Sequence, residues 1–257
     1  MNDESFPIAW FSVHLSSFIV FLATFAAGII NSIAGGGTLI SFPTLVWLGR
    51  NPILANATNA AALWPGSFAG MVGFRKDLAT LPRWLYWLTI PSLLGGAAGA
   101  ILLLHTSTRT FERLVPWLIL GATLLLAGQE MITRHVNLHG NVAFVFILQF
   151  IVSIYGGYFG AGMGILMLAA LGLIGLTDLH QMNGLKNLLA ICINGVAAIY
   201  FAASGAVIWS DAILMAIAGI LGGFAGAKLA HRLGRKFVRT AVVVIGLGMT
   251  IALFLKR

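Results

Sequence analysis

Three consecutive glycines inside a long apolar stretch are the part of this sequence best suited to binding a ligand. The run from Gly35 to Gly37 follows Asn31 and is itself followed by Thr38 and Ser41, whose hydroxyl groups open the next segment. Each glycine lowers helix stability by about 1 kcal/mol relative to alanine, so the run favours unwound backbone. A helix that begins after such a break offers unpaired N–H groups and the positive end of its dipole, which suit an anion. The alternative is that these glycines only permit tight helix packing.

A second glycine-rich break and two polar clusters accompany the first break. The run Tyr155–Gly164 contains Tyr158, Gly160 and Gly162 at the corresponding place in the second half of the chain. Buried amides cost free energy unless they are hydrogen-bonded, so the polar side chains after each break either bond to neighbouring helices or face a substrate. The two clusters consist of Asn56, Thr58 and Asn59 in the first half, and of Asn183, Lys186, Asn187 and Asn194 in the second.

Lys186 allows two interpretations. It is either an interfacial lysine whose ammonium group reaches water, or a cation within the membrane, where it would be a counter-charge for an anion. The acidic residues offer no matching clue, because Asp77, Glu112 and Asp178 all lie near the boundaries of apolar runs. Proton or sodium coupling commonly uses a carboxylate within the membrane. A coupling ion, proton or sodium, therefore cannot be assigned to a residue.

The sequence contains no arrangement typical of an enzyme. There is no Gly-x-Ser-x-Gly, no Walker motif and no His-Glu-x-x-His. His135 and His139 are spaced like zinc ligands, but they flank Asn137 in a short loop with no glutamate between them. We expect no catalytic activity, no cofactor and no bound metal.

The composition requires membrane-spanning helices to position these residues. Hydrophobic residues make up 59% of the chain and charged residues 9%, whereas a soluble domain carries about 25% charged residues. The apolar residues form uninterrupted runs, as helices surrounded by lipid require. These runs cover residues 10–49, 51–74, 84–108, 114–129, 140–177, 187–210, 212–227 and 240–255. We predict an all-α integral membrane protein with about eight hydrophobic segments.

The eight runs fall into two similar halves of four. Each half opens with a long run, and the segment Leu94–Ala100 recurs as Leu221–Ala227 at nearly the spacing that relates Asn59 to Asn187. We predict an internal duplication, with a short tail at 1–12, a first membrane repeat at 13–133, a linker loop at 134–141 and a second membrane repeat at 142–257. A continuous helix over 10–49 would be about 60 Å long, twice the ~30 Å hydrocarbon thickness, so the first element of each half must break at its glycines.

The basic residues favour one orientation. If each long element enters the membrane and returns as a half-helix, the two halves are inverted repeats, an architecture common among transporters. The inner loops then hold Arg75, Lys76, Arg83, Arg134, Lys228, Arg232, Arg235, Lys236 and Arg239, against Arg50, Arg109, Arg113, Lys256 and Arg257 outside. Eight simple spans would give a weaker bias. Because basic loops face the cytoplasm, both versions place the two termini on the non-cytoplasmic side.

Other features exclude further classes. The net charge of +8 reflects basic loops, since no basic face with interleaved aromatic residues exists outside the apolar runs, and nucleic-acid binding is not expected. Cys192 has no second cysteine to pair with and is read as a small packed hydrophobe. The chain opens Met-Asn-Asp-Glu-Ser without a basic n-region, so the first apolar run is expected to stay in the mature protein.

The motifs together resemble a known family. The runs Asn31–Thr38, Asn56–Asn59, Tyr158–Gly164 and Leu185–Leu189 look like those of the TauE/SafE sulfite exporter family, also called the toluene sulfonate uptake permease family. The resemblance extends over about 18–255 and is most specific in the glycine motifs. It implies a bacterial plasma (inner) membrane carrier for small sulfur-containing anions such as sulfite, sulfonates or sulfoacetate. It fixes neither the anion nor the direction of transport.

The sequence thus favours a multi-pass secondary transporter that works by alternating access between two repeats. The alternatives are an anion channel and a non-transport membrane subunit of a larger complex. The expected partners are a small anionic substrate and the lipid bilayer, and assembly into a homo-oligomer is left open by the sequence. The predicted substrate-binding residues are Asn31, Gly35, Gly36, Gly37, Thr38, Ser41, Asn56, Thr58, Asn59, Tyr158, Gly160, Gly162, Asn183, Lys186, Asn187 and Asn194.

Overall fold

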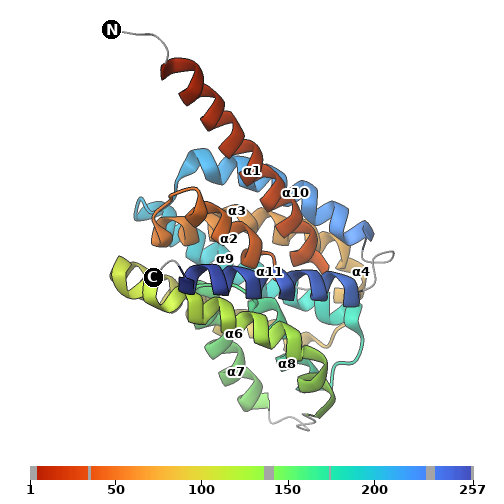
Figure 1. Cartoon of the computed structure of the whole chain (residues 1–257). Helices are drawn as coiled ribbons and strands as arrows, with labels where there is room; N and C mark the ends of the chain where they lie inside the picture. Colours follow the sequence, from red (N-terminus) through yellow and green to blue (C-terminus); the bar gives the residue numbers. More distant parts are fainter. Residues whose placement is uncertain (1–4, 34–35, 136–141, 174, 230–234, 256–257) are drawn as a thin grey trace.

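The computed structural model describes residues 5–33, 36–135, 142–173, 175–229 and 235–255. Over these ranges the chain forms helices and no strand, which confirms the all-α prediction (Figure 1). The elements are α1 (Ser5–Ile33), α2 (Thr38–Trp47), α3 (Pro52–Gly73), α4 (Arg75–Leu78), η1 (Arg83–Leu88), α5 (Thr89–His105), α6 (Thr108–His135), α7 (Val142–Tyr158), α8 (Met163–Leu173), α9 (Leu179–Ala203), α10 (Trp209–Leu229) and α11 (Arg235–Leu255).

Both long apolar runs are interrupted at their glycine-rich segments, as the sequence predicted. The first run divides into α1 and α2, and the second into α7 and α8. At the first break the chain turns back along α1. Gly37 lies so close to α1 that a Cβ added to it would come within 2.1 Å of the Ala27 carbonyl oxygen. At the second break, a Cβ added to Gly156 would meet the Sδ atom of Met163 at 2.5 Å. Each break is therefore the tip of a helical hairpin.

Two of the predicted segments overlap helices. Helix α1 begins at Ser5, within the segment 1–12 that was expected to be a tail, and α6 extends to His135, into the expected linker 134–141. The remainder of that linker, 136–141, lies outside the described residues. The division of the chain into two repeats remains a prediction.

Local capping fixes where the two polar helices begin. The Asn51 side chain accepts hydrogen bonds from the backbone N–H groups of Ile53 and Leu54 at 3.0 and 3.3 Å, and Pro52 follows as the first residue of α3. Asp178 does the same at the start of α9, accepting from His180 and Gln181 at 2.8 and 3.3 Å. Side-chain acceptors at these positions satisfy N–H groups that have no partner within the helix. The caps set the register that places the two asparagine clusters.

Glycines bring helices of the two halves into close contact. Helix α1 packs on α10, and α5 packs on α7. A Cβ added to Gly222 would lie 2.2 Å from the Phe25 carbonyl oxygen, and one added to Gly99 would lie 2.1 Å from that of Ile154. Further along α1 and α10, Gly226 approaches Ile29, so these two helices run in the same direction.

Helices α3 and α9 form the central pair and run in opposite directions. The Trp64 indole nitrogen donates to the Ile191 carbonyl oxygen at 3.1 Å, and Gly195 lies against the same indole ring. Gly70, further along α3, meets Asn187 at an earlier point of α9. The polar residues of both helices consequently face one another in the interior.

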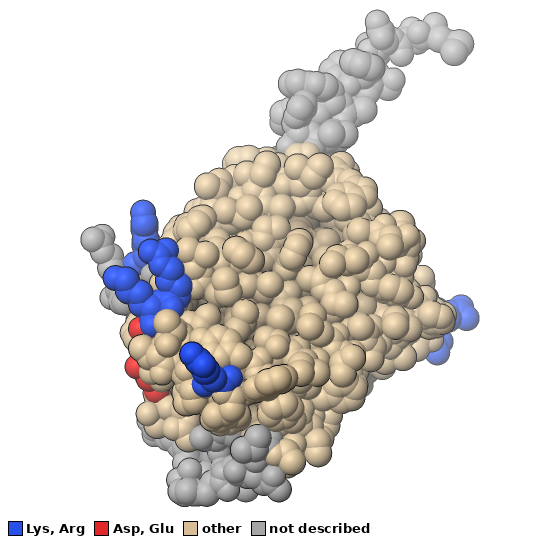
Figure 2. Space-filling view, turned by 180° about the vertical axis from the view of Figure 1, so that it is seen from behind, with Lys and Arg blue, Asp and Glu red and all other residues tan. Residues whose placement is uncertain are grey.

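The outer surface is apolar over a broad band. Large side chains such as Trp47, Ile199 and Leu255 are 69%, 66% and 81% exposed. In Figure 2 the charged side chains collect at opposite edges of the molecule, with a wide uncharged surface between them. Such a surface suits hydrocarbon rather than water. Four helices of the described residues are long and apolar enough to cross a membrane, over Leu15–Ser32, Arg83–His105, His180–Ala203 and Trp209–Gly226.

Candidate functional site

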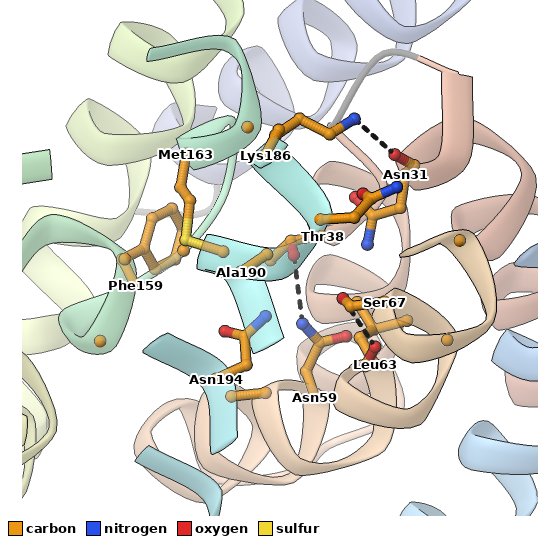
Figure 3. A pocket seen from close by; sticks show the side chains of 18 of the residues that line it. Asn31, Thr38, Asn59, Leu63, Ser67, Phe159, Met163, Lys186, Ala190 and Asn194 are labelled. Carbon is orange, nitrogen blue, oxygen red and sulfur yellow. Dashed lines mark hydrogen bonds between the residues drawn. The ribbon is translucent and has the colours of Figure 1, made fainter. Parts of the chain in front are cut away.

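A polar cavity of about 50 Å³ lies where the two hairpin tips meet α3 and α9 (Figure 3). Its wall combines amides, hydroxyl groups and one ammonium group with small and apolar residues. The lining residues are Asn31, Ser32, Thr38, Asn56, Asn59, Ala60, Leu63, Gly66, Ser67, Gly70, Gly156, Gly157, Phe159, Gly160, Met163, Gly164, Lys186, Asn187, Ala190 and Asn194.

Hydrogen bonds hold the first tip against α3. The Gly37 backbone N–H donates to Oδ1 of Asn31 at 2.9 Å, which ties the start of α2 to the last turn of α1. Asn59 donates from Nδ2 to the Thr38 hydroxyl at 3.4 Å and accepts at Oδ1 from the Ser41 hydroxyl. The asparagine of α3 thus fixes the first turn of α2, whose N-terminal end faces the cavity.

The second tip is held in a similar way. Nδ2 of Asn56 donates to the Tyr158 carbonyl oxygen at 2.9 Å, at the end of α7. The chain then turns through Gly160 and Gly162, whose φ angles of 76° and 73° lie in the left-handed region that favours glycine. Helix α8 starts directly afterwards at Met163, so a second helix N-terminus also borders the cavity.

Lys186 lies in the interior. It is 2% exposed, and its Nζ atom donates to Oδ1 of Asn183 at 2.9 Å and to the Asn31 main-chain oxygen at 3.3 Å. Its ammonium group therefore does not extend to the surface, and its role as a counter-charge for an anion stays a prediction. A charge buried within a membrane is costly and marks a functional position.

Three buried polar atoms of the cavity wall have no hydrogen-bond partner among the described residues. They are Oγ of Ser32, Oδ1 of Asn56 and Nδ2 of Asn187. These side chains are only 4%, 2% and 4% exposed. Leaving such an atom unpaired costs about 1–3 kcal/mol, so a cluster of them at one cavity indicates that a bound solute or water completes their hydrogen bonds.

Aromatic side chains pack beside the cavity at the second tip. Phe159 lines it and meets Phe42 edge to face, with ring centroids 5.3 Å apart. Phe111 packs on both rings, at 6.2 Å from Phe159 and 6.4 Å from Phe42. All three residues are at most 3% exposed, so they form a dry wall beside the polar groups.

The structure brings together half of the predicted site residues in the cavity wall. Those that line it are Asn31, Thr38, Asn56, Asn59, Gly160, Lys186, Asn187 and Asn194. Those that lie beside it, in the hairpin tips or the same helices, are Gly36, Gly37, Ser41, Thr58, Tyr158, Gly162 and Asn183. Gly35 lies outside the described residues. Thr58 points elsewhere, since its hydroxyl accepts from the Ile208 N–H at 2.9 Å.

Sequence reasoning missed one wall of the cavity. Leu63, Gly66 and Gly70 follow Asn59 at steps of three and four residues, so they lie on the same face of α3. That spacing was readable in the sequence once Asn59 was assigned to the site. Ser32, Phe159 and Met163 carried no comparable signal, because their position depends on how the two hairpins reverse.

The groups that line this cavity are suited to binding a ligand. Among the described residues, no three His, Cys, Asp or Glu side chains lie close enough together to hold a metal ion. In the described part of the chain, one ammonium group, five asparagine amides, three hydroxyl groups and two helix N-termini surround a small space. These groups suit a small anion.

Comparison with protein families gives a match over most of the chain. The family model "Sulfite exporter TauE/SafE" matches residues 20–253. The chain belongs to the TauE/SafE sulfite exporter family. The family is therefore the one that the glycine motifs resembled, and the apolar helices are those of a multi-pass membrane protein.

Several known proteins are similar to this chain over nearly their whole length. A probable membrane transporter protein of Haemophilus influenzae is 28% identical over 238 residues, covering 90% of this chain and 92% of the relative. The probable membrane transporter protein YfcA of Escherichia coli K12 is 28% identical over 239 residues, covering 90% and 87%. The probable membrane transporter protein ORF9 of a Sinorhizobium species is 30% identical over 245 residues, covering 93% and 92%. Family and relatives support a membrane transporter.

Proposed function

We propose that this TauE/SafE member is a secondary carrier for small sulfur-containing anions, such as sulfite, sulfonates or sulfoacetate, across the bacterial plasma membrane. One observation carries the proposal. Two interrupted helices place their N-terminal ends at one buried cavity that also contains the Lys186 ammonium group and the unpartnered amide nitrogen of Asn187. Helix N-termini and a buried cation attract an anion, and unsatisfied donors bind its oxygen atoms.

The size of the cavity restricts what it holds in this conformation. One water needs about 10–15 Å³ of such volume, so roughly four waters or one compact anion fill the cavity of about 50 Å³. A sulfite ion matches that space. Sulfoacetate is larger and requires the hairpin tips to move apart.

The helix directions support alternating access by two inverted halves. Helix α1 runs parallel to α10, and Gly95 and Gly99 of α5 meet Phe150 and Ile154 of α7 in the same order, so this pair is also parallel. Parallel α1 and α10 are the first helix of one half and a later helix of the other, as inverted repeats require. Movement of one half against the other would then open the cavity first to one side and next to the other.

The exposed basic residues support an orientation. Arg75, Lys76 and Arg83 are exposed at the end of the molecule where α3 stops, and the positive-inside rule places that end in the cytoplasm. Helix α1 approaches this end from its N-terminus, so the N-terminus and, by the inverted arrangement, the C-terminus lie on the non-cytoplasmic side.

Sulfite flux into liposomes that contain the purified protein tests the proposal. We expect flux that saturates with substrate and that accelerates when sulfite is present on the far side, which separates a carrier from a channel. Replacing Asn59 and Asn187 together by alanine is expected to reduce flux at least tenfold, since both amides line the cavity. Unchanged flux in that double variant would contradict the site, and linear unsaturable flux would contradict the carrier.

A further inference from the structure

The two hairpin tips are held from the opposite half by donors of different charge. Asn31 lies in the last turn of α1, and its main-chain oxygen accepts from Nζ of Lys186 on α9. Tyr158 ends α7, and its main-chain oxygen accepts from Nδ2 of Asn56 on α3. In both cases the donor belongs to the polar cluster of the other half. One tip therefore receives an ammonium group and the other receives a neutral amide.

The end of α1 is an electrostatic site for a cation. The last carbonyl groups of a helix have no partner within it, and that end carries about half a negative charge. Lys186 also donates to the Asn183 side-chain oxygen at 2.9 Å, so its ammonium group lies among oxygen acceptors. Secondary carriers use the same groups, carbonyls at the C-terminal ends of interrupted helices, to coordinate a coupling sodium ion.

We propose that Lys186 is a built-in cation that takes the place of a coupling sodium ion, so that this carrier binds its anion without Na⁺. The inference rests on the proposed carrier function and assigns the role of one residue within the same site. Lys186 is buried, lines the cavity and directly precedes Asn187 on α9. Its charge is covalently attached beside the substrate, and the anion therefore meets a positive charge that need not be recruited from solution.

The first half of the chain supplies the neutral counterpart of this residue. Thr58 precedes Asn59 as Lys186 precedes Asn187, and its hydroxyl oxygen acts as an acceptor for the Ile208 N–H. The variant Lys186→Thr therefore removes the charge, shortens the side chain and leaves a hydroxyl oxygen that can coordinate a cation. We expect Na⁺ to bind in the vacated space, beside the oxygens of Asn31 and Asn183.

Thermal melting of the purified full-length protein tests this role without any sulfur anion. Melting temperatures are compared in sodium chloride and in choline chloride at equal ionic strength. Sodium is expected to raise the Tm of Lys186→Thr by a few degrees, because a ligand that binds only the native state stabilises it. Wild type, Lys186→Arg and Lys76→Thr are expected to melt equally in both salts. Lys76 is exposed on α4 and provides a matched loss of one positive charge.

A Tm of folded Lys186→Thr that does not respond to sodium would overturn the inference, as would a sodium-dependent Tm of the wild type. If Lys186→Thr does not fold, sulfite binding by the wild type decides. Equal affinity in sodium and choline supports the inference, and an affinity at least tenfold lower in choline overturns it. The absence of sulfite binding in both salts would instead contradict the proposed substrate, while the melting result with Lys186→Arg and wild type would still test the sodium role.

Discussion

At the scale of single residues, Asn187 has a side chain that suits ligand binding better than it suits stability. Its amide nitrogen is buried without a partner among the described residues and lies against Gly70, where an added Cβ would come within 2.9 Å of it. A residue selected for stability alone would be apolar or fully hydrogen-bonded at such a position. Binding sites commonly retain polar groups that cost stability in the empty protein.

This contrast gives a prediction for Asn187→Leu. Leucine has a similar size and removes the unpartnered amide, so the Tm is expected to stay equal or to rise, by the equivalent of roughly 1 kcal/mol. Sulfite affinity is expected to fall at least tenfold, or about 1.4 kcal/mol. Thermal melting and sulfite titration of the same preparation measure both quantities. A variant that loses stability and keeps its affinity would show that the amide is structural.

Residue types near the glycine breaks were predictable, whereas their exact contacts were not. The sequence correctly indicated that both long apolar runs would be interrupted at their glycines. It could not show that Ser41 reaches Asn59, or that Thr58 turns away toward Ile208. Those contacts depend on how α2 and α10 lie against α3, which periodicity along one helix does not encode.

At the scale of elements, close packing of parallel helices depends on glycines whose missing side chains leave room for a neighbouring backbone. Gly99 of α5 is one of them, and all three atoms nearest to an added Cβ, at 2.1, 2.7 and 3.0 Å, belong to the backbone of α7. Backbone cannot move aside as a flexible side chain does. This packing explains why the similar segments Leu94–Ala100 and Leu221–Ala227 both contain small residues.

A pair of glycine-to-alanine variants tests this packing. Gly99→Ala is expected to destabilise the protein by about 1–3 kcal/mol, because the methyl group forces α5 and α7 apart. Gly121→Ala in α6 is the matched control, since no described atom lies within 4 Å of its added Cβ. That substitution is expected to be neutral or to stabilise by up to about 1 kcal/mol through helix propensity. Equal melting temperatures of both variants would refute the packing role of Gly99.

At the scale of the whole molecule, an ion pair joins the start of α3 to the start of α10, on the side opposite to the basic end of α3. Arg50, between α2 and α3, donates from Nε and Nη2 to the Asp211 carboxylate at 2.7 and 3.2 Å. The hydrogen bond to Asp211 raises the pKa of Arg50, so the guanidinium group stays charged throughout the physiological pH range. The side chain of Arg50 is 37% exposed, and the pair therefore contributes modestly to stability, about 0–1 kcal/mol.

From its position, we expect this pair to matter more for transport than for stability. If the halves move against each other, Arg50 and Asp211 must separate whenever the cavity opens toward their side. A pair that contributes little to folding can still bias that equilibrium, because a shift of about 1 kcal/mol between two states changes their ratio about fivefold.

Covalent linkage of the two positions tests that movement. Cysteines replace Arg50 and Asp211 in a Cys192→Ala background, and a short bifunctional thiol-reactive cross-linker with a cleavable spacer joins them. The linked protein is expected to bind sulfite but to lose exchange across the liposome membrane, and cleavage of the linker is expected to restore it. The control joins Ser107→Cys to Thr110→Cys, two exposed positions within the first half whose native hydroxyl oxygens are 2.8 Å apart. Because that linkage crosses no moving boundary, it is expected to leave exchange intact. Full exchange by the protein linked between positions 50 and 211 would mean that the halves do not separate there, and would require a different opening movement.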